Sequence, residues 1–227
     1  MCELWVLPSG LRLSGPDDGG PRDPDRPQDL RGLRPVRLRL PPRSDQGGMK
    51  LQIVIAGVGG QGVLFAARLL YHLAHLRGEE VFGAETHGMS QRGGSVISYV
   101  KIGSFTSPLI RRGRADLLLG LEREEGLRNL PMLHEGGAAV INAREVPEVE
   151  GVELYPVEAD LLAQEVGDPR TANLVLMSFA ASLGLLPFSE GEILEAVSQL
   201  VPPALKGVNV EAVKRGFTLG RASPSLT

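Results

Sequence analysis

A glycine-rich turn, Gly57-Val58-Gly59-Gly60-Gln61-Gly62, follows a run of apolar residues and precedes a long apolar segment. Glycines at this spacing let backbone N–H groups approach a phosphate at the start of a helix. The pattern leaves three readings open: a tight turn without a ligand, a turn for a phosphate-bearing ligand, and a turn for NAD or FAD. If the turn binds NAD or FAD, Glu85 lies about where a carboxylate that binds the ribose is expected. The candidate ligand contacts in this turn are Gly57, Gly59, Gly60, Gln61 and Gly62.

A second polar loop, residues 85–95, combines an acid, an imidazole, a carboxamide, a guanidinium and three glycines. In an extended segment Glu85 and His87 point to the same face, where the carboxylate could fix the imidazole tautomer. Arg92, beside two glycines, can present a bidentate guanidinium to a carboxylate or phosphate. Alternatively, the loop has a structural role only: its glycines let two backbone segments approach closely, and Arg92 forms an ion pair within the protein. The candidate catalytic residues are His87 and Arg92, and the candidate ligand contacts are Gln91, Arg92, Gly93, Gly94 and Ser95.

The elements that must position these loops follow from the hydrophobic periodicity of the chain. It predicts strands at 51–56, 80–84, 95–102, 116–120, 138–142 and 152–157, and helices at 63–77, 122–130, 158–167, 171–186, 190–201 and 209–216. Ser189 and Glu192 form a capping-box pattern before the helix at 190–201. This alternation predicts an α/β domain: a three-layer α/β/α, Rossmann-like fold with a mostly parallel sheet that is mixed around the strand at 95–102.

Composition excludes several classes of site. The net charge of −3 offers no general surface for nucleic acid, and the apolar stretch at 174–188 is too short for a membrane span. Its part at 174–186 is either the central packing helix or a subunit interface. The single cysteine, Cys2, excludes an iron–sulfur cluster held by this chain alone and fits a reducing, cytoplasmic compartment. No metal site is predicted, because His72 and His75 share a polar helical stripe with Arg68 and lack a third ligand.

The chain divides in composition near Met49. Residues 1–48 are rich in proline, glycine and arginine, with apolar residues too sparse to offset the entropy of ordering, so we expect a disordered or loosely packed extension. Met49 is a plausible true start, because an organised strand begins immediately after it. The remaining residues, 49–227, suit one domain.

The two loops together resemble the gamma-type subunit or domain of the 2-oxoacid:ferredoxin oxidoreductases. The resemblance rests on Gly-Val-Gly-Gly-Gln-Gly-Val at 57–63 and His-Gly-Met-Ser-Gln-Arg-Gly-Gly-Ser-Val at 87–96, and it extends over about 49–218. Within the family, the form His87-Gly88-Met89 is most like the beta subunits of the indolepyruvate branch, which acts on aryl 2-oxoacids. A pyruvate-type or 2-oxoglutarate-type gamma subunit is the alternative within the family.

The resemblance implies a subunit of a complex that oxidatively decarboxylates a 2-oxoacid, reduces ferredoxin and transfers the acyl group to coenzyme A. It assigns thiamine diphosphate, Mg²⁺ and the iron–sulfur clusters to a larger partner subunit, with no cofactor bound by this chain alone. Coenzyme A or the substrate carboxylate would meet the two glycine loops at the interface, and the chain would be inactive by itself. Two other classes stay open: a stand-alone nucleotide-binding oxidoreductase that uses the first turn and Glu85, and a scaffold with an empty cleft.

Overall fold

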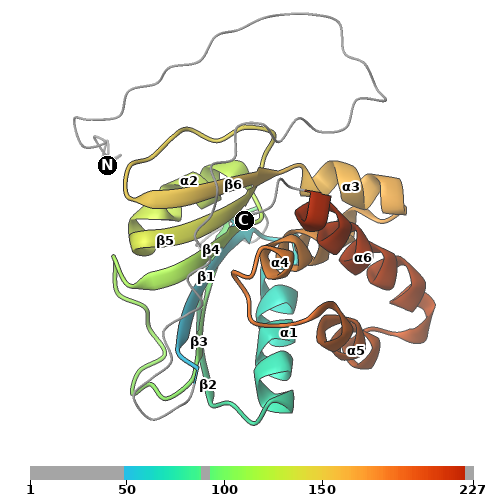
Figure 1. Cartoon of the computed structure of the whole chain (residues 1–227), viewed down its shortest axis with the longest axis horizontal. Coiled ribbons are helices and arrows are strands. Elements are labelled where there is room, and N and C mark those ends of the chain that lie inside the picture. Colours follow the sequence, from blue (N-terminus) through green and yellow to red (C-terminus); the bar gives the residue numbers. More distant parts are fainter. Residues whose placement is uncertain (1–48, 88–92, 223–227) are drawn as a thin grey trace, which may run out of the picture.

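A computed structural model of the chain describes residues 49–87 and 93–222, so the predicted extension at 1–48 lies outside the described residues. A six-stranded sheet forms the middle of the molecule, with strand order β2-β3-β1-β4-β5-β6 (Figure 1). In chain order its strands are β1 (Leu51–Val58), β2 (Val81–His87), β3 (Ser95–Ile102), β4 (Ala115–Gly120), β5 (Leu133–Asn142) and β6 (Val152–Val157).

The sheet is mostly parallel, and β3 is its antiparallel member. β1, β4, β5 and β6 pair in parallel, whereas β3 runs antiparallel to both β1 and β2. The prediction of a mixed sheet around residues 95–102 is therefore confirmed. Because β3 runs backwards along β1, its first residue, Ser95, pairs with the last residue of β1, Val58. This register brings the end of the second glycine loop next to the first.

Helices cover the two faces of the sheet unequally. They are α1 (Val63–Leu76), α2 (Arg123–Asn129), α3 (Ala159–Val166), α4 (Ala172–Ser182), α5 (Glu190–Leu200) and α6 (Lys206–Ala222). All but α2 lie on the side of the larger core, where Ile53 and Ile55 of β1 pack (Figure 1). Val54 and Ala56 face the smaller core, which Leu127 of α2 helps to cover. The predicted α/β architecture with two helical layers is confirmed, with one thick layer and one thin layer.

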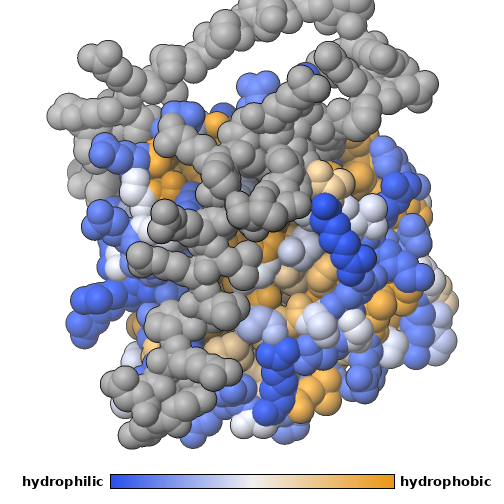
Figure 2. Space-filling model, viewed as in Figure 1, coloured by the Kyte–Doolittle hydropathy of each residue, from blue (hydrophilic) through white to orange (hydrophobic). Residues whose placement is uncertain are grey.

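Helix α4 is the central packing helix. Its residues from Asn173 to Ala181 are all buried, and its main partner is α6. A Cβ atom on Gly216 of α6 would lie only 2.5 Å from the Val175 carbonyl oxygen, so the two backbones approach closely. The apolar stretch at 174–188 therefore packs within the domain. In the space-filling view, hydrophilic residues are interspersed with hydrophobic ones on the visible face of this helical layer (Figure 2).

Several element boundaries differ from the expectation. Strand β2 continues to His87 rather than ending at residue 84, because Glu85, Thr86 and His87 pair with β3. Glu85 therefore lies inside a strand and not in a loop. Helix α6 is also longer than the segment 209–216, and β5 begins five residues early. The capping box of Ser189 and Glu192 is confirmed. Within the described residues, no helix is both long and apolar enough to cross a membrane.

Candidate functional site

The first glycine turn lies at the carboxyl edge of the sheet, between β1 and α1. Gly60 and Gly62 have positive φ angles of 101° and 79°, which L side chains rarely adopt. The Gln61 side chain folds back, and its Oε1 accepts a hydrogen bond from the Val58 N–H at 2.9 Å. Gly62 is the N-cap of α1, and it offers no side chain to cap the first-turn N–H groups. The turn thus leaves the amino end of α1 open toward a ligand.

The second glycine loop touches the first through its last residues. The Gly59 N–H donates to the Gly94 carbonyl oxygen at 3.0 Å. Ser95, the next residue, starts β3, and its hydroxyl donates to Glu125 Oε2 of α2 at 2.7 Å. The candidates Gln91 and Arg92 lie outside the described residues. The backbone of His87 pairs with Val96 of β3. The two predicted loops therefore meet at Gly59 and Gly94.

A cavity of about 210 Å³ opens beside the first turn, on the side toward α4. It is lined by Gly60, Gln61, Leu121, Asp160, Pro169, Arg170, Ala172 and Asn173. A second hollow of about 270 Å³ shares Asp160. Its other lining residues come from the end of β5, the loop after it, α3 and the residue before α3: Asn142, Ala143, Arg144, Glu158, Leu161 and Gln164. Both hollows lie beyond the carboxyl ends of parallel strands, the usual ligand position in open α/β sheets. Gly93, Gly94 and Ser95 do not line either one.

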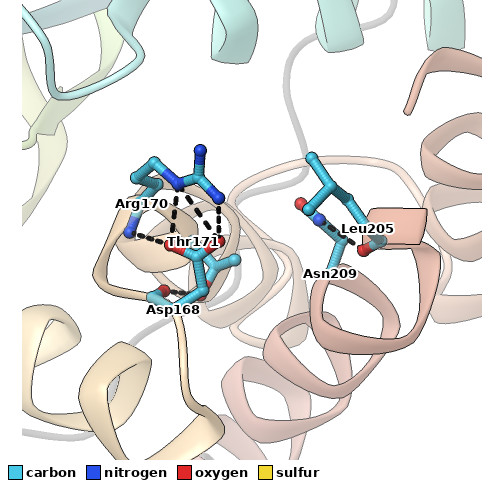
Figure 3. A network of polar contacts seen from close by, with 5 residues as sticks. All are labelled: Asp168, Arg170, Thr171, Leu205 and Asn209. Atoms are coloured by element: carbon cyan, nitrogen blue, oxygen red, sulfur yellow. Dashed lines mark hydrogen bonds and ion pairs between the residues drawn. The ribbon is translucent and has the colours of Figure 1, made fainter. Parts of the chain in front are cut away.

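The wall opposite the glycine turn is the start of α4. Arg170 holds Asp168 in a bidentate contact, with Nη2 at 2.6 Å from Oδ2 and Nε at 2.9 Å from Oδ1 (Figure 3). The hydrogen bonds from Arg170 lower the pKa of the Asp168 carboxyl. Thr171 fixes the same turn, since its hydroxyl donates to the Asp168 carbonyl at 2.7 Å (Figure 3). The arginine is thereby positioned at the rim of the cavity.

Asn173 connects this wall to the glycine turn. Its Nδ2 donates to the Gly62 carbonyl oxygen at 3.2 Å, and its Oδ1 accepts from the Leu174 N–H at 2.8 Å. The residue is 95% buried, with 5% of its surface exposed. A single amide therefore sets the spacing between the first turns of α1 and α4, on which the cavity depends.

Most of the cavity lining is apolar, and its polar groups include several hydrogen-bond donors. Within the described residues no acceptor binds Gln61 Nε2, and neither α1 nor α4 has a side-chain cap. Arg170 lies at the rim, where Asp168 balances its charge, and Asp160 is the one carboxylate in the lining. Helix amino ends, amide donors and a guanidinium together suit a phosphate or a carboxylate.

Sequence reasoning missed Asp160, Arg170 and Asn173. These residues lie about a hundred positions beyond the glycine turn, and no motif connects them to it. One local pattern could have indicated them: Asp168-Pro169-Arg170-Thr171 is a typical helix start, and helices of an open α/β fold often begin at the carboxyl edge of the sheet.

The strand order disfavours the NAD reading of the first turn. In a dinucleotide-binding fold the strand that carries the ribose-binding acid lies directly beside β1. Here β3 intervenes between β1 and β2, so Glu85 lies two strand spacings away, or roughly 10 Å. In the polar stripe of α1, His72 Nε2 contacts Gln199 Oε1 of α5 at 2.7 Å, whereas Arg68 and His75 are exposed. Among the described residues no group of three or more His, Cys, Asp or Glu could hold a metal ion.

Comparisons with known proteins agree with this architecture. The family model described as pyruvate ferredoxin/flavodoxin oxidoreductase matches residues 52–219. The indolepyruvate oxidoreductase subunit IorB of Thermococcus kodakarensis is 38% identical over 187 residues, covering 72% of this chain and 93% of the relative. The subunit of the same name from Archaeoglobus fulgidus is 32% identical over 190 residues, covering 74% and 94%.

A solved structure shares the fold. The gamma subunit of a keto/oxoacid ferredoxin oxidoreductase from Geobacter sulfurreducens superposes with a TM-score of 0.63 at 25% identity, covering 76% of this chain and 99% of that one. The region that the family model matches, residues 52–219, includes the glycine turn, the end of the second loop and the start of α4. The chain therefore belongs to the pyruvate ferredoxin/flavodoxin oxidoreductase family.

Proposed function

We propose that this chain is a subunit of a 2-oxoacid:ferredoxin oxidoreductase complex that acts on indolepyruvate or related aryl 2-oxoacids. Identity of 38% to a relative named as an indolepyruvate oxidoreductase subunit supports the substrate class. The form His87-Gly88-Met89 in the second loop favours the same branch. The chain acts as part of the complex and has no activity alone.

The cleft at the carboxyl edge is the part of this subunit that meets coenzyme A or the carboxylate of the 2-oxoacid. The observation that carries this proposal is the hydrogen bond from Gly59 to Gly94, which joins the two glycine loops beside the cavity that Gln61 and Arg170 line. The cavity of about 210 Å³ is smaller than the roughly 300 Å³ at which ligand pockets usually begin. It therefore holds one anionic group, and the partner subunit encloses the rest of the ligand at the interface.

The larger partner subunit holds thiamine diphosphate, Mg²⁺ and the iron–sulfur clusters. The chain contains a single cysteine, whereas a cluster with thiolate ligands needs about four. Ferredoxin accepts electrons from the assembled complex, and the 2-oxoacid and coenzyme A are its small-molecule substrates. A reducing, cytoplasmic compartment suits such a complex.

Copurification tests the assembly. The tagged full chain is expressed with its genomic neighbours, and the bound protein is identified by mass spectrometry. We expect a companion that contains thiamine diphosphate and iron–sulfur clusters, and coenzyme A-dependent reduction of ferredoxin that is fastest with indolepyruvate among indolepyruvate, pyruvate and 2-oxoglutarate. A preference for either of the other acids would overturn the branch, and tight binding of NAD(H) or FAD by the isolated chain would overturn the class.

Arg92→Ala tests the role of the cleft in that complex. We expect the KM for coenzyme A or for the 2-oxoacid to rise about tenfold, because a bidentate contact to an anion is lost. Unchanged kinetics for both substrates would exclude the second loop from the ligand site. Arg215→Ala, on the far helix α6 and partly paired with Glu211 at 3.8 Å, is the matched control.

A further inference from the structure

A buried carboxylate on the thin side of the sheet holds the end of the second glycine loop. Glu125 of α2 is only 5% exposed, and its Oε2 accepts the hydroxyl proton of Ser95 at 2.7 Å. Arg128, one helical turn later, donates to the other carboxylate oxygen. Each carboxylate oxygen thus has a hydrogen-bond partner, and the two contacts orient the carboxylate.

Two neighbouring side chains fix the backbone of Glu125. Its N–H donates to Glu122 Oε2 at 2.8 Å, and its carbonyl oxygen accepts from Asn129 Nδ2 at 2.8 Å. Burying a carboxylate costs free energy, and an apolar side chain of similar size would often fill such a place at lower cost. Stability alone therefore does not explain the residue, whereas its hold on Ser95 gives it a purpose.

The residues Gly93–Ser95 are consequently held from two sides. Gly94 accepts from Gly59 of the first turn, and Ser95 donates to Glu125 of α2. A serine hydroxyl has one proton, so once that proton is directed to Glu125 the hydroxyl can only accept from a ligand. Ser95 therefore holds the end of the loop, and its hydroxyl proton is not directed to a phosphate.

We infer that Glu125 is a positioning residue of this enzyme: through Ser95 it fixes the Gly94 carbonyl against Gly59 and so sets the distance between the two glycine loops. This inference rests on the proposed function, because the loops matter for catalysis only if a substrate meets them. Glu125 itself touches neither cavity. Its effect passes through the hydroxyl of Ser95.

The test removes the anchor without leaving a charge unpaired. Ser95→Ala deletes the hydroxyl, Ser95→Thr restores one on a side chain that suits a strand, and Glu125→Gln gives a second route to the same bond. Hydrogen–deuterium exchange of the Gly59 amide is measured on the full chain, and the KM and kcat for coenzyme A and the 2-oxoacid on the assembled complex. Glu124→Gln is the matched control, because Glu124 is exposed on the same helix and pairs with Arg123.

We expect Ser95→Ala to raise the Gly59 exchange rate about tenfold, since a hydrogen bond to a charged group is lost. The KM for one substrate should rise about fivefold to tenfold with kcat within about twofold, and Ser95→Thr should recover most of both effects. Unchanged exchange at Gly59 would overturn the inference and leave the proposed function intact. Faster exchange with unchanged KM values in an active complex would overturn both the positioning role and the proposed ligand cleft, while an inactive wild-type complex would count against the proposed function alone.

Discussion

The amide of Gly59 donates a hydrogen bond to the carbonyl oxygen of Gly94 over 3.0 Å, and this contact makes two distant loops one feature. It extends the pairing of β1 with β3, in which Val58 lies opposite Ser95, by one residue. An antiparallel neighbour places the start of one strand beside the end of the other. A purely parallel sheet would have separated the two glycine loops by the full length of a strand.

The first prediction concerns Gly62, which starts α1 and contacts Asn173. Gly62→Ala places a Cβ in the left-handed region, at φ 79°, and against Asn173 Nδ2. We expect the free energy of unfolding of the chain to fall by about 2 to 4 kcal/mol, from backbone strain and overpacking together. Urea denaturation with linear extrapolation measures the loss.

Gly60→Ala is the control for this change. Its φ of 101° is also unfavourable for alanine, but no atom lies within 4 Å of the added Cβ. It should cost about 1 to 2 kcal/mol, from strain alone. Equal losses in the two variants would show that Asn173 does not restrict the turn.

Much of the fold was predictable from local pattern. The buried run at residues 51–56 and the Ser189–Glu192 capping box are local features, and both were confirmed. The end of β2 was not predictable, because Glu85 and His87 are polar and become strand residues only through pairing with β3. Tertiary pairing overrides intrinsic propensity at such positions.

The candidate site was predictable in part, because two of its motifs are local in the sequence. These are the glycine turn and the Arg-Gly-Gly-Ser run, each recognisable from its residue types and spacing. The opposite wall, with Arg170 and Asn173, is created by the packing of α4 against the start of α1. The contact between Gly62 and Asn173 cannot be predicted from the residue spacing within either segment.

The second prediction concerns the contact between α4 and α6. A Cβ on Gly216 would lie 2.5 Å from the Val175 carbonyl oxygen and 2.7 Å from Ser178 Cβ, both on the buried α4. Gly216→Ala should lower the free energy of unfolding by about 2 to 3 kcal/mol, because neither the backbone nor a buried side chain can move aside easily. Gly207→Ala, in the first turn of the same helix, meets nothing within 4 Å and should raise stability by about 0.5 kcal/mol through helix propensity. Changes of the same sign in the two variants would contradict the close approach of these helices.

The third prediction concerns Arg170 at the rim of the cavity. Its contact with Asp168 engages Nε and Nη2, so about three of the five guanidinium N–H groups remain for a ligand. Arg170→Gln should raise the KM for coenzyme A about tenfold in the assembled complex with kcat unchanged, because uniform binding is lost. The effect should shrink at high salt, since the arginine is exposed.

Arg215→Gln provides the comparison for Arg170. Arg215 is also exposed, but it lies on α6 near Glu165 and Glu211 and lines neither cavity. A similar rise in the KM for coenzyme A in both variants would indicate a general charge effect, and the proposed site at the start of α4 would then be wrong.

The fourth prediction concerns the pH dependence of stability at Glu192. A hydrogen bond from Arg77 at 2.6 Å is the main cause that lowers the pKa of this carboxyl to about 2, and the Ser189 cap adds to it. A carboxyl whose pKa is lower in the folded state contributes stability above its unfolded value of 4.5, and that stability is lost as the pH falls toward about 2.

Glu192→Gln should therefore lower the unfolding free energy by about 1 to 2 kcal/mol at neutral pH, after allowance for solvent screening of side chains that are a third exposed. The difference from the wild type should vanish as the pH falls through this window, because the protonated wild-type carboxyl then loses its charge as well. Urea denaturation at several pH values between neutrality and the acid limit follows the two curves. Within the described residues, the Glu195 carboxylate on the same helix contacts only the neutral amide of Gln199, at 3.3 Å, so the curve of Glu195→Gln should run parallel to the wild type. A constant gap between Glu192→Gln and the wild type at all pH values would show that the Arg77 contact does not depend on the charge of Glu192.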